Sequence, residues 1–203
     1  MRDELIYVLD LIGTLAFAIS GIQTAADKRM DVFGAMMIGF ITALGGGTVR
    51  DMLLGQQPVS WFHDLNYLLV VILAVGIVFA FAKHVRRLKQ TLFLFDTIGI
   101  GVFTLIGVEK SLSLGISAPY AVIMGMVTSV VGGATRDVLC NDIPLILQKE
   151  VYATACLLGG GTYVFLNMMG VGLVVNSFVT MSTVIVIRLL SIKYHISLPR
   201  MRR

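Results

Sequence analysis

Two short stretches of this sequence place a run of glycines directly before an arginine and an aspartate. Residues 45–51 read GGGTVRD and residues 131–137 read VGGATRD, with an offset of 86 residues between them. Glycines remove side-chain packing and free the backbone, so a helix at either stretch is predicted to thin, bend or break. A break would free carbonyl oxygens as ligands for a cation, and a charged pair follows within one turn. The pattern favours a polar pathway over simple packing.

The candidate site residues form two groups. The first contains the glycines at which helices would hinge, with the hydroxyl groups beside them: Gly45, Gly46, Gly47, Gly132, Gly133, Thr42, Thr128 and Ser129. The second contains charged residues predicted to form pairs along the pathway: Asp10, Asp51, Asp96, Asp137, Arg50 and Arg136. Charges inside apolar segments are costly, so they pair with each other or line water-filled cavities. We expect each arginine to hold a helix end by pairing with an aspartate, because an unpaired arginine would repel cations.

The composition around these residues is that of a membrane protein with several spans. Of the 203 residues, 57% are apolar and only 14% are charged, and the mean hydropathy is +0.88. The formal charge of +4 comes from short basic clusters beside apolar runs, which is typical of topology signals, so no nucleic-acid partner is expected. Cys140 and Cys156 fit neither a disulfide framework nor a metal site, and no nucleophile–base motif is present. We therefore expect no cofactor and no enzyme.

Seven apolar runs approach the length of about 20 helical residues that crosses a bilayer. They are residues 5–25, 32–54, 67–82, 92–111, 118–140, 151–169 and 171–190. The connections between them are brief and leave no room for a soluble domain. The sequence therefore predicts an all-α membrane protein in which residues 1–203 form a single transmembrane domain of seven helices.

The offset of 86 residues relates more than the glycine motifs. It also pairs Asp10 with Asp96 and Phe17 with Phe103, so the chain contains an internal duplication. Each unit holds three apolar runs, an odd number, and the second unit is therefore inverted in the membrane relative to the first. Inverted repeats that meet near the midplane are a recurring plan for ion and solute pathways. The predicted parts are a first repeat (5–85), a second repeat (91–170), a seventh helix (171–190) and a basic cytoplasmic tail (191–203).

The lysines and arginines predict the orientation of these spans. Most of them fall in the loops after the first, third and fifth runs and near the carboxyl end, with Arg188 counted on that side. This bias places the N-terminus outside and the C-terminus in the cytoplasm. Trp61 and Tyr67 are then predicted to be interfacial anchors on the outer side. Asp10 and the first glycine motif would lie in the outer half of the membrane, and Asp96 and the second motif in the inner half.

At these residues the sequence resembles the prokaryotic members of the trimeric intracellular cation (TRIC) channel family, which overlaps bacterial sequences labelled glycine transporters. The resemblance rests on the pattern Gly-Gly-x-x-x-Arg-Asp at 46–51 and 132–137, and on the Asp-x-x-Gly starts at Asp10 and Asp96. The three-plus-three-plus-one spans and their orientation also match, so the resemblance covers essentially the whole chain. Val131 departs from a full triple glycine in the second repeat, so the two gates need not be equivalent.

The resemblance implies a symmetric homotrimer in the bacterial inner membrane, with one potassium-permeable pore in each subunit. The second and fifth spans would be kinked at their glycine motifs and line the pore with the first and fourth spans. Potassium and sodium would be the permeant ions, with potassium only weakly preferred, and membrane lipids would be bound around the trimer.

Two other functions remain open at this stage. One is a secondary transporter of a small zwitterion such as glycine, in which Arg50 or Arg136 holds the carboxylate and an aspartate holds the ammonium group. The other is a membrane scaffold that transports no solute. The channel and the transporter use the same architecture, so the residues themselves do not separate them.

Overall fold

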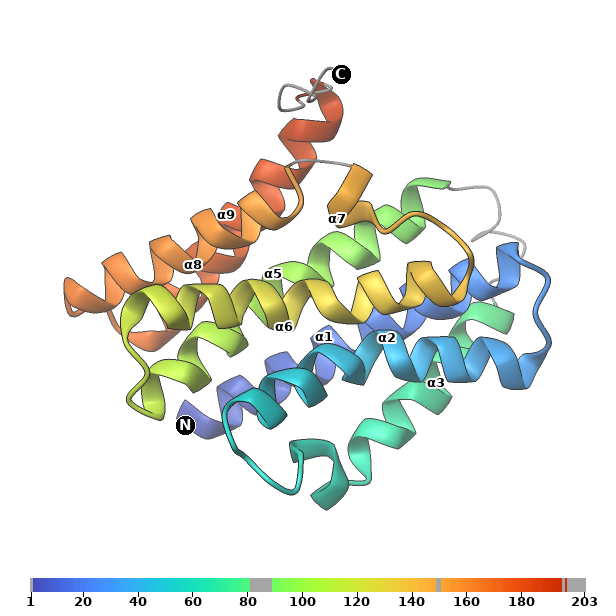
Figure 1. Ribbon diagram of the computed structural model, residues 1–203, viewed down its shortest axis with the longest axis horizontal. Helices are drawn as coiled ribbons and strands as arrows, with labels where there is room; N and C mark the ends of the chain where they lie inside the picture. Colours follow the sequence, from blue (N-terminus) through green and yellow to red (C-terminus); the bar gives the residue numbers. More distant parts are fainter. Residues whose placement is uncertain (1, 81–88, 149–150, 195, 197–203) are drawn as a thin grey trace.

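The computed structural model describes residues 2–80, 89–148, 151–194 and 196, and this part of the chain is helical throughout, with no strand (Figure 1). The longest helices are α1 (Arg2–Asp27), α2 (Val32–Leu53), α5 (Lys89–Ser113), α6 (Ala118–Leu139) and α9 (Leu173–Lys193). The shorter ones are α3 (Asn66–Ala80), α7 (Leu145–Gln148), α8 (Ala153–Met168) and the 3-10 helix η1 (Ser60–His63). Each of the seven predicted apolar runs coincides with one of these helices.

Five of the helices are long and apolar enough to cross a membrane, namely α1, α2, α5, α6 and α9. The helices α3 and α8 have 15 and 16 residues. At 1.5 Å per residue a helix of this length reaches about 24 Å, less than the hydrocarbon thickness of about 30 Å. The predicted end of the first repeat at residue 85 and most of the predicted basic tail (191–203) lie outside the described residues.

Apolar and polar side chains are distributed as in a membrane protein. Large apolar side chains such as Phe33, Leu69 and Phe178 are more than half exposed on the outside of the bundle, where a water-soluble protein would carry polar groups. The interior instead holds many hydroxyl groups, including those of Thr14, Ser20, Thr42, Thr97, Thr104, Ser111, Thr128 and Ser129, all fully buried. The polar groups are therefore gathered along the centre of the bundle, away from lipid.

The two repeats run in opposite directions. Figure 1 shows α1 antiparallel to α5 and α2 antiparallel to α6, with each repeat contributing one helix to each pair. The contacts are reciprocal: Phe17 packs where Gly99 has no side chain, and Phe103 packs beside Gly13, 3.2 Å from where a methyl group would stand. The two rings meet with their centroids 5.1 Å apart. When a contact from the first repeat to the second is matched by the equivalent contact from the second repeat to the first, the two repeats are related by a two-fold axis.

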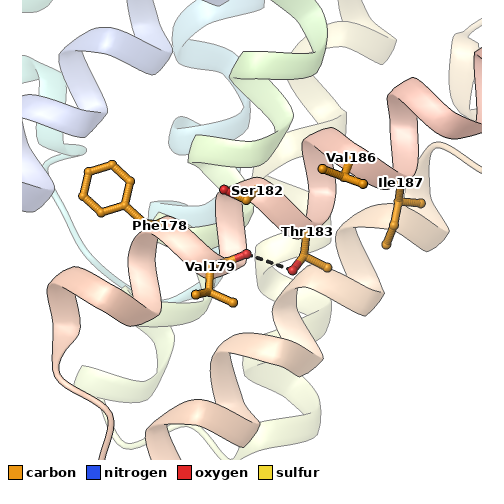
Figure 2. Close-up of a pocket in the computed structure, with 6 residues that line it drawn as sticks. All are labelled: Phe178, Val179, Ser182, Thr183, Val186 and Ile187. Atoms are coloured by element: carbon orange, nitrogen blue, oxygen red, sulfur yellow. Dashed lines mark hydrogen bonds between the residues drawn. The ribbon is translucent and has the colours of Figure 1, made fainter.

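The last two helices, α8 and α9, pack against each other beside the α5–α6 pair. Gly159 of α8 allows this contact, because a methyl group there would overlap the side chain of Val184 in α9. The outer face of α9 carries a shallow apolar groove, and the hydrogen bond there, from the Thr183 hydroxyl to the Val179 carbonyl at 2.8 Å, stays within the helix (Figure 2). This groove suits lipid tails or a neighbouring subunit rather than a polar solute.

Candidate functional site

The glycine motifs do not interrupt their helices. Helix α2 continues through Gly45, Gly46 and Gly47, and α6 continues through Gly132 and Gly133. The predicted break, with carbonyl oxygens freed as cation ligands, is therefore wrong for this structure. The physical reason is that a run of glycines can keep its helical hydrogen bonds when a second helix packs against the bare backbone.

That second helix is the equivalent helix of the other repeat. A methyl group on Gly46 would overlap the carbonyl oxygen of Thr128, and one on Gly132 would overlap the carbonyl oxygen of Thr42, both well inside 3.0 Å. The Cα–H groups of the two glycines therefore point at these oxygens, in the weak hydrogen bonds common where membrane helices cross closely. The centre of each motif makes the α2–α6 crossing possible.

The outer positions of the motifs differ from the centre. A methyl group on Gly45 would find its nearest neighbour, the Cα of Gly132, at an ordinary 3.8 Å. The equivalent position in the second repeat is Val131, so the departure from a triple glycine falls where a side chain fits. At Gly133 a methyl group would lie only 3.2 Å from the Tyr152 hydroxyl and 3.6 Å from Asp96 Oδ1. Gly133 thus opens space beside a charged group.

The hydroxyl groups predicted to line the pathway are buried at the same crossing. Thr42 and Thr128 each donate a 2.6 Å hydrogen bond to the carbonyl four residues earlier in their own helix. Ser129 donates to the Met126 carbonyl at 2.9 Å. Their hydrogens are therefore occupied, while the oxygen lone pairs remain the groups that could face a cation.

The first charged centre forms where α2 ends. Arg50 Nε and Lys110 Nζ each lie 2.8 Å from the same oxygen of Asp51, Oδ1. The other oxygen accepts hydrogen bonds from the backbone N–H of Ser60 at 3.0 Å and from the Ser60 hydroxyl at 2.7 Å. Asp51 is buried and fully hydrogen-bonded, so it fastens the end of α2 to η1 and to α5.

Asp10 belongs to the same centre but pairs differently. Its Oδ2 accepts a 2.8 Å hydrogen bond from the hydroxyl of Tyr67, and no direct ion pair to Arg50 is formed among the described residues. Tyr67 is only 6% exposed, which corrects its prediction as an interfacial anchor. Asp10, Arg50, Tyr67 and Phe103 border a cavity of about 20 Å³, which has room for about one water molecule.

The second charged centre is built on the equivalent residues of the second repeat. Arg136 donates to Asp137 Oδ1 at 2.8 Å, to Asp96 Oδ1 at 3.0 Å and to the Ser20 hydroxyl at 2.6 Å. Asp137 Oδ2 accepts the backbone N–H of Leu145 at 2.9 Å, as Asp51 accepts that of Ser60. Each arginine pairs with an aspartate, as predicted, and in both repeats this is the aspartate that follows it in sequence; only Arg136 also bonds to the aspartate of the other helix.

Arg188 is the residue of this centre that sequence reasoning missed. It was counted with the cytoplasmic basic residues, but its side chain is fully buried and its Nη2 lies 4.0 Å from Asp96 Oδ2. Its guanidinium group packs against the rings of Phe93 and Tyr152, at 4.7 Å and 4.5 Å from their centroids. The signal was its place inside the apolar run 171–190, because an ionisable residue within a span is a functional candidate by default.

Lys110, at the end of the apolar run 92–111, was also missed, because it was counted only as a basic residue of the outer side. It gives the first centre its second basic group. Each centre contains two carboxylates and two basic groups, and is neutral when all four are ionised. The first consists of Asp10, Asp51, Arg50 and Lys110, and the second of Asp96, Asp137, Arg136 and Arg188. The fold and these centres define a polytopic membrane protein with an inverted repeat whose interior carries two balanced clusters of charge, in which Asp10 and Lys110 are partly exposed and the other members are buried.

Comparison with known proteins places the chain in a family. The model of a family described as "Glycine transporter" matches residues 7–83 and again residues 93–168, one match to each repeat. A UPF0126 membrane protein of Vibrio cholerae is 42% identical over 98% of this chain and 84% of its own length. The UPF0126 inner membrane protein YadS of Escherichia coli K12 is 42% identical over 96% and 95%.

Two solved structures share the fold closely. A TRIC trimeric intracellular cation channel orthologue from Rhodobacter sphaeroides is 31% identical over 95% of this chain and 99% of its own, with a TM-score of 0.87. A prokaryotic TRIC channel crystallised in 0.5 M KCl is 34% identical over 96% and 99%, with a TM-score of 0.89. The chain belongs to this family of glycine-transporter-like and TRIC proteins. It is a multi-pass protein of the bacterial inner membrane and not an enzyme.

Proposed function

We propose that this protein is a monovalent cation channel with one pore in each subunit of a homotrimer. The observation that carries the proposal is the pair of inverted, charge-balanced centres, placed on helices α1, α2, α5 and α6, with Arg188 from α9, in a fold shared with TRIC cation channels. Potassium and sodium are the permeant ions, with weak preference for potassium, and the pore needs no cofactor. Carboxylates and hydroxyl groups replace part of the hydration shell of the ion as it passes.

The pathway runs from one charged centre to the other past the α2–α6 crossing, and it is closed in this conformation. The cavity beside Asp10 has room for about one water molecule, and the buried rings of Phe17 and Phe103 stand between the two centres. The gate is therefore the crossing of bare backbones together with this aromatic pair. Because no side chains interlock at Gly46 and Gly132, the two helices can move against each other there, and in this proposal that motion takes the place of the bending predicted for these glycines.

All seven apolar helices span the membrane in this proposal, with the N-terminus outside and the C-terminus in the cytoplasm. The shorter spans, α3 and α8, follow the segments η1 and α7, which pack on the ends of α2 and α6 and cover the ends of the bundle. The centre at Asp51 then lies in the outer half of the membrane and the centre at Asp137 in the inner half. Lipids and neighbouring subunits cover the exposed apolar side chains, including the α9 groove.

The test is a recording in a planar bilayer with purified protein and a KCl gradient. Discrete openings that reverse near the potassium potential are expected. Asp10→Asn and Asp96→Asn should each lower the unitary conductance, because they remove a charge that offsets that of the ion. Asp142→Asn is the matched control, since its exposed carboxylate pairs with Lys28 at the surface and lies outside both centres. Silent bilayers from folded protein would overturn the proposal.

A transporter of glycine is the second candidate, and two observations favour it. The family model carries that description, and the buried Nη1 of Arg50 has no hydrogen-bond partner among the described residues. A guanidinium nitrogen beside Asp10 could hold a carboxylate while Asp10 holds an ammonium group. The cavity there is too small for glycine, so this function requires an opened state. Saturable glycine uptake by liposomes from the same preparation, lost in Arg50→Gln, would establish it.

A further inference from the structure

The second carboxylate oxygen of Asp96 is a buried charge without a hydrogen-bond partner. Asp96 is fully buried, its Oδ1 is bound by Arg136, and its Oδ2 accepts no hydrogen bond from any described residue. Arg188 Nη2 lies 4.0 Å from this oxygen, beyond the 2.7–2.9 Å of a charge-assisted hydrogen bond. A buried ionised oxygen left in this state points to a group that binds there in another state of the protein.

Other polar atoms around this oxygen are equally incomplete. The hydroxyl of Tyr152 and the Nε and Nη2 atoms of Arg188 are buried and have no hydrogen-bond partner among the described residues. The Tyr152 hydroxyl borders the space that Gly133 leaves open, 3.2 Å from where a methyl group would stand, and Asp96 Oδ1 and Arg136 Nη2 border it at 3.6 Å. The unpaired Tyr152 hydroxyl therefore lies on the same small polar space as the Asp96 carboxylate, whose other oxygen is the unpaired one.

Comparison of the two repeats shows what Arg188 changes. In the first repeat the Tyr67 hydroxyl, at the start of α3, donates to Asp10 Oδ2 at 2.8 Å. In the second repeat Tyr152, at the start of α8, lies with its ring against Arg188, and Asp96 Oδ2 is left without a donor. Arg188 belongs to α9, outside the duplicated units, so it is an addition that breaks the symmetry. It supplies a positive charge beside Asp96 without bonding to it.

We propose that Asp96 Oδ2 and the Tyr152 hydroxyl form a binding site for one monovalent cation, and that the Arg188 guanidinium is a tethered competitor for that site. The inference rests on the proposed channel function and adds a residue of α9 that controls access to the inner centre. With Arg188 in place the four charges of this centre balance, and a second cation would be repelled. When α9 carries Arg188 away, the centre holds one excess negative charge, which one monovalent cation neutralises.

The competition can be measured without any current. Arg188→Gln leaves Asp96 with an uncompensated charge, so potassium should stabilise the variant by binding. The thermal midpoint of detergent-solubilised protein is compared in KCl and in N-methyl-D-glucamine chloride at equal ionic strength. At potassium ten times its Kd, mass action raises the folding constant about 11-fold, which moves the midpoint of a chain this size by about 3–6 °C. Wild type should show little of this potassium dependence.

Two variants provide the controls. Lys193→Gln removes the same charge from an exposed position one turn further along α9, and it should melt like wild type in both salts. The double variant Asp96→Asn/Arg188→Gln lacks the site, so its potassium dependence should disappear. In bilayers, Arg188→Gln should conduct more than wild type and Lys193→Gln should not.

The outcomes separate this inference from the channel function. Equal thermal midpoints of Arg188→Gln in potassium chloride and in N-methyl-D-glucamine chloride would overturn the site. A stabilisation in potassium chloride that is lost in potassium gluconate would also overturn it, because the bound ion would then be chloride. If neither Arg188→Gln nor the double variant folds in either salt, Arg188 is needed for packing, and the proposed cation site is overturned as well. If wild type is silent in bilayers, the channel proposal fails while the melting experiment still decides the cation site.

Discussion

The α2–α6 crossing predicts that three adjacent glycines respond differently to the same small change. Alanine at position 45 fits, because its methyl group would be 3.8 Å from the nearest atom. Alanine at position 46 does not fit, because its methyl group would overlap the Thr128 carbonyl oxygen. The methyl carbon would stand 2.0 Å from that oxygen, and an ordinary contact begins at 3.4 Å, so the two groups would have to separate by about 1.4 Å. Gly132→Ala should behave like Gly46→Ala, since the overlap with Thr42 is equivalent.

The magnitude follows from comparing Gly46→Ala with Gly45→Ala. Both changes gain the same helix propensity, about 1 kcal/mol, so that gain cancels in the difference. The overlap at position 46 costs about 1–3 kcal/mol as overpacking. Losing the Cα–H···O contact adds about 0.5–1 kcal/mol. Gly46→Ala should therefore be less stable than Gly45→Ala by about 1.5–4 kcal/mol.

The assay is the thermal midpoint of each detergent-solubilised variant, measured beside wild type. The change is about 2–4 °C for each kcal/mol in a protein of this size, so the expected difference is readily resolved. Gly45→Ala should melt at or above the wild-type midpoint, and Gly46→Ala and Gly132→Ala below it. Equal thermal midpoints for Gly45→Ala and Gly46→Ala would refute the close α2–α6 crossing. They would instead support the hypothesis that the glycine run bends freely.

Two further predictions use the symmetry of the repeats. Tyr67→Phe removes the hydroxyl that binds Asp10 and should cost about 1.5–3 kcal/mol in unfolding free energy. Tyr152→Phe removes a hydroxyl that has no described partner, so in potassium-free buffer its unfolding free energy should stay near wild type; equal losses would contradict the contrast. Phe17→Ala and Phe103→Ala should each cost about 3–5 kcal/mol and raise potassium flux in liposomes. Unchanged flux in both variants would exclude the aromatic pair from the gate.

The sequence alone determined the helices and their duplication. Apolar runs of about 20 residues and their short connections are local features, and the 86-residue offset from Asp10 to Asp96 can be read without coordinates. Buried charge could also be predicted, because an ionisable residue in an apolar run must find a partner. That each arginine pairs with an aspartate could be predicted in the same way, and the structure has the pairs Arg50 with Asp51 and Arg136 with Asp137.

The tertiary structure decided what packs against these residues, and this could not be read from the chain. Whether a glycine run breaks a helix or lets another helix approach depends on the surface opposite, which for Gly46 is Thr128 in the other repeat. The partners Lys110 and Arg188 come from helices distant in sequence, and their charges alone suggested only topology. Local propensity specifies which segments form helices, while the role of a small or charged residue is set by contacts that only folding brings together.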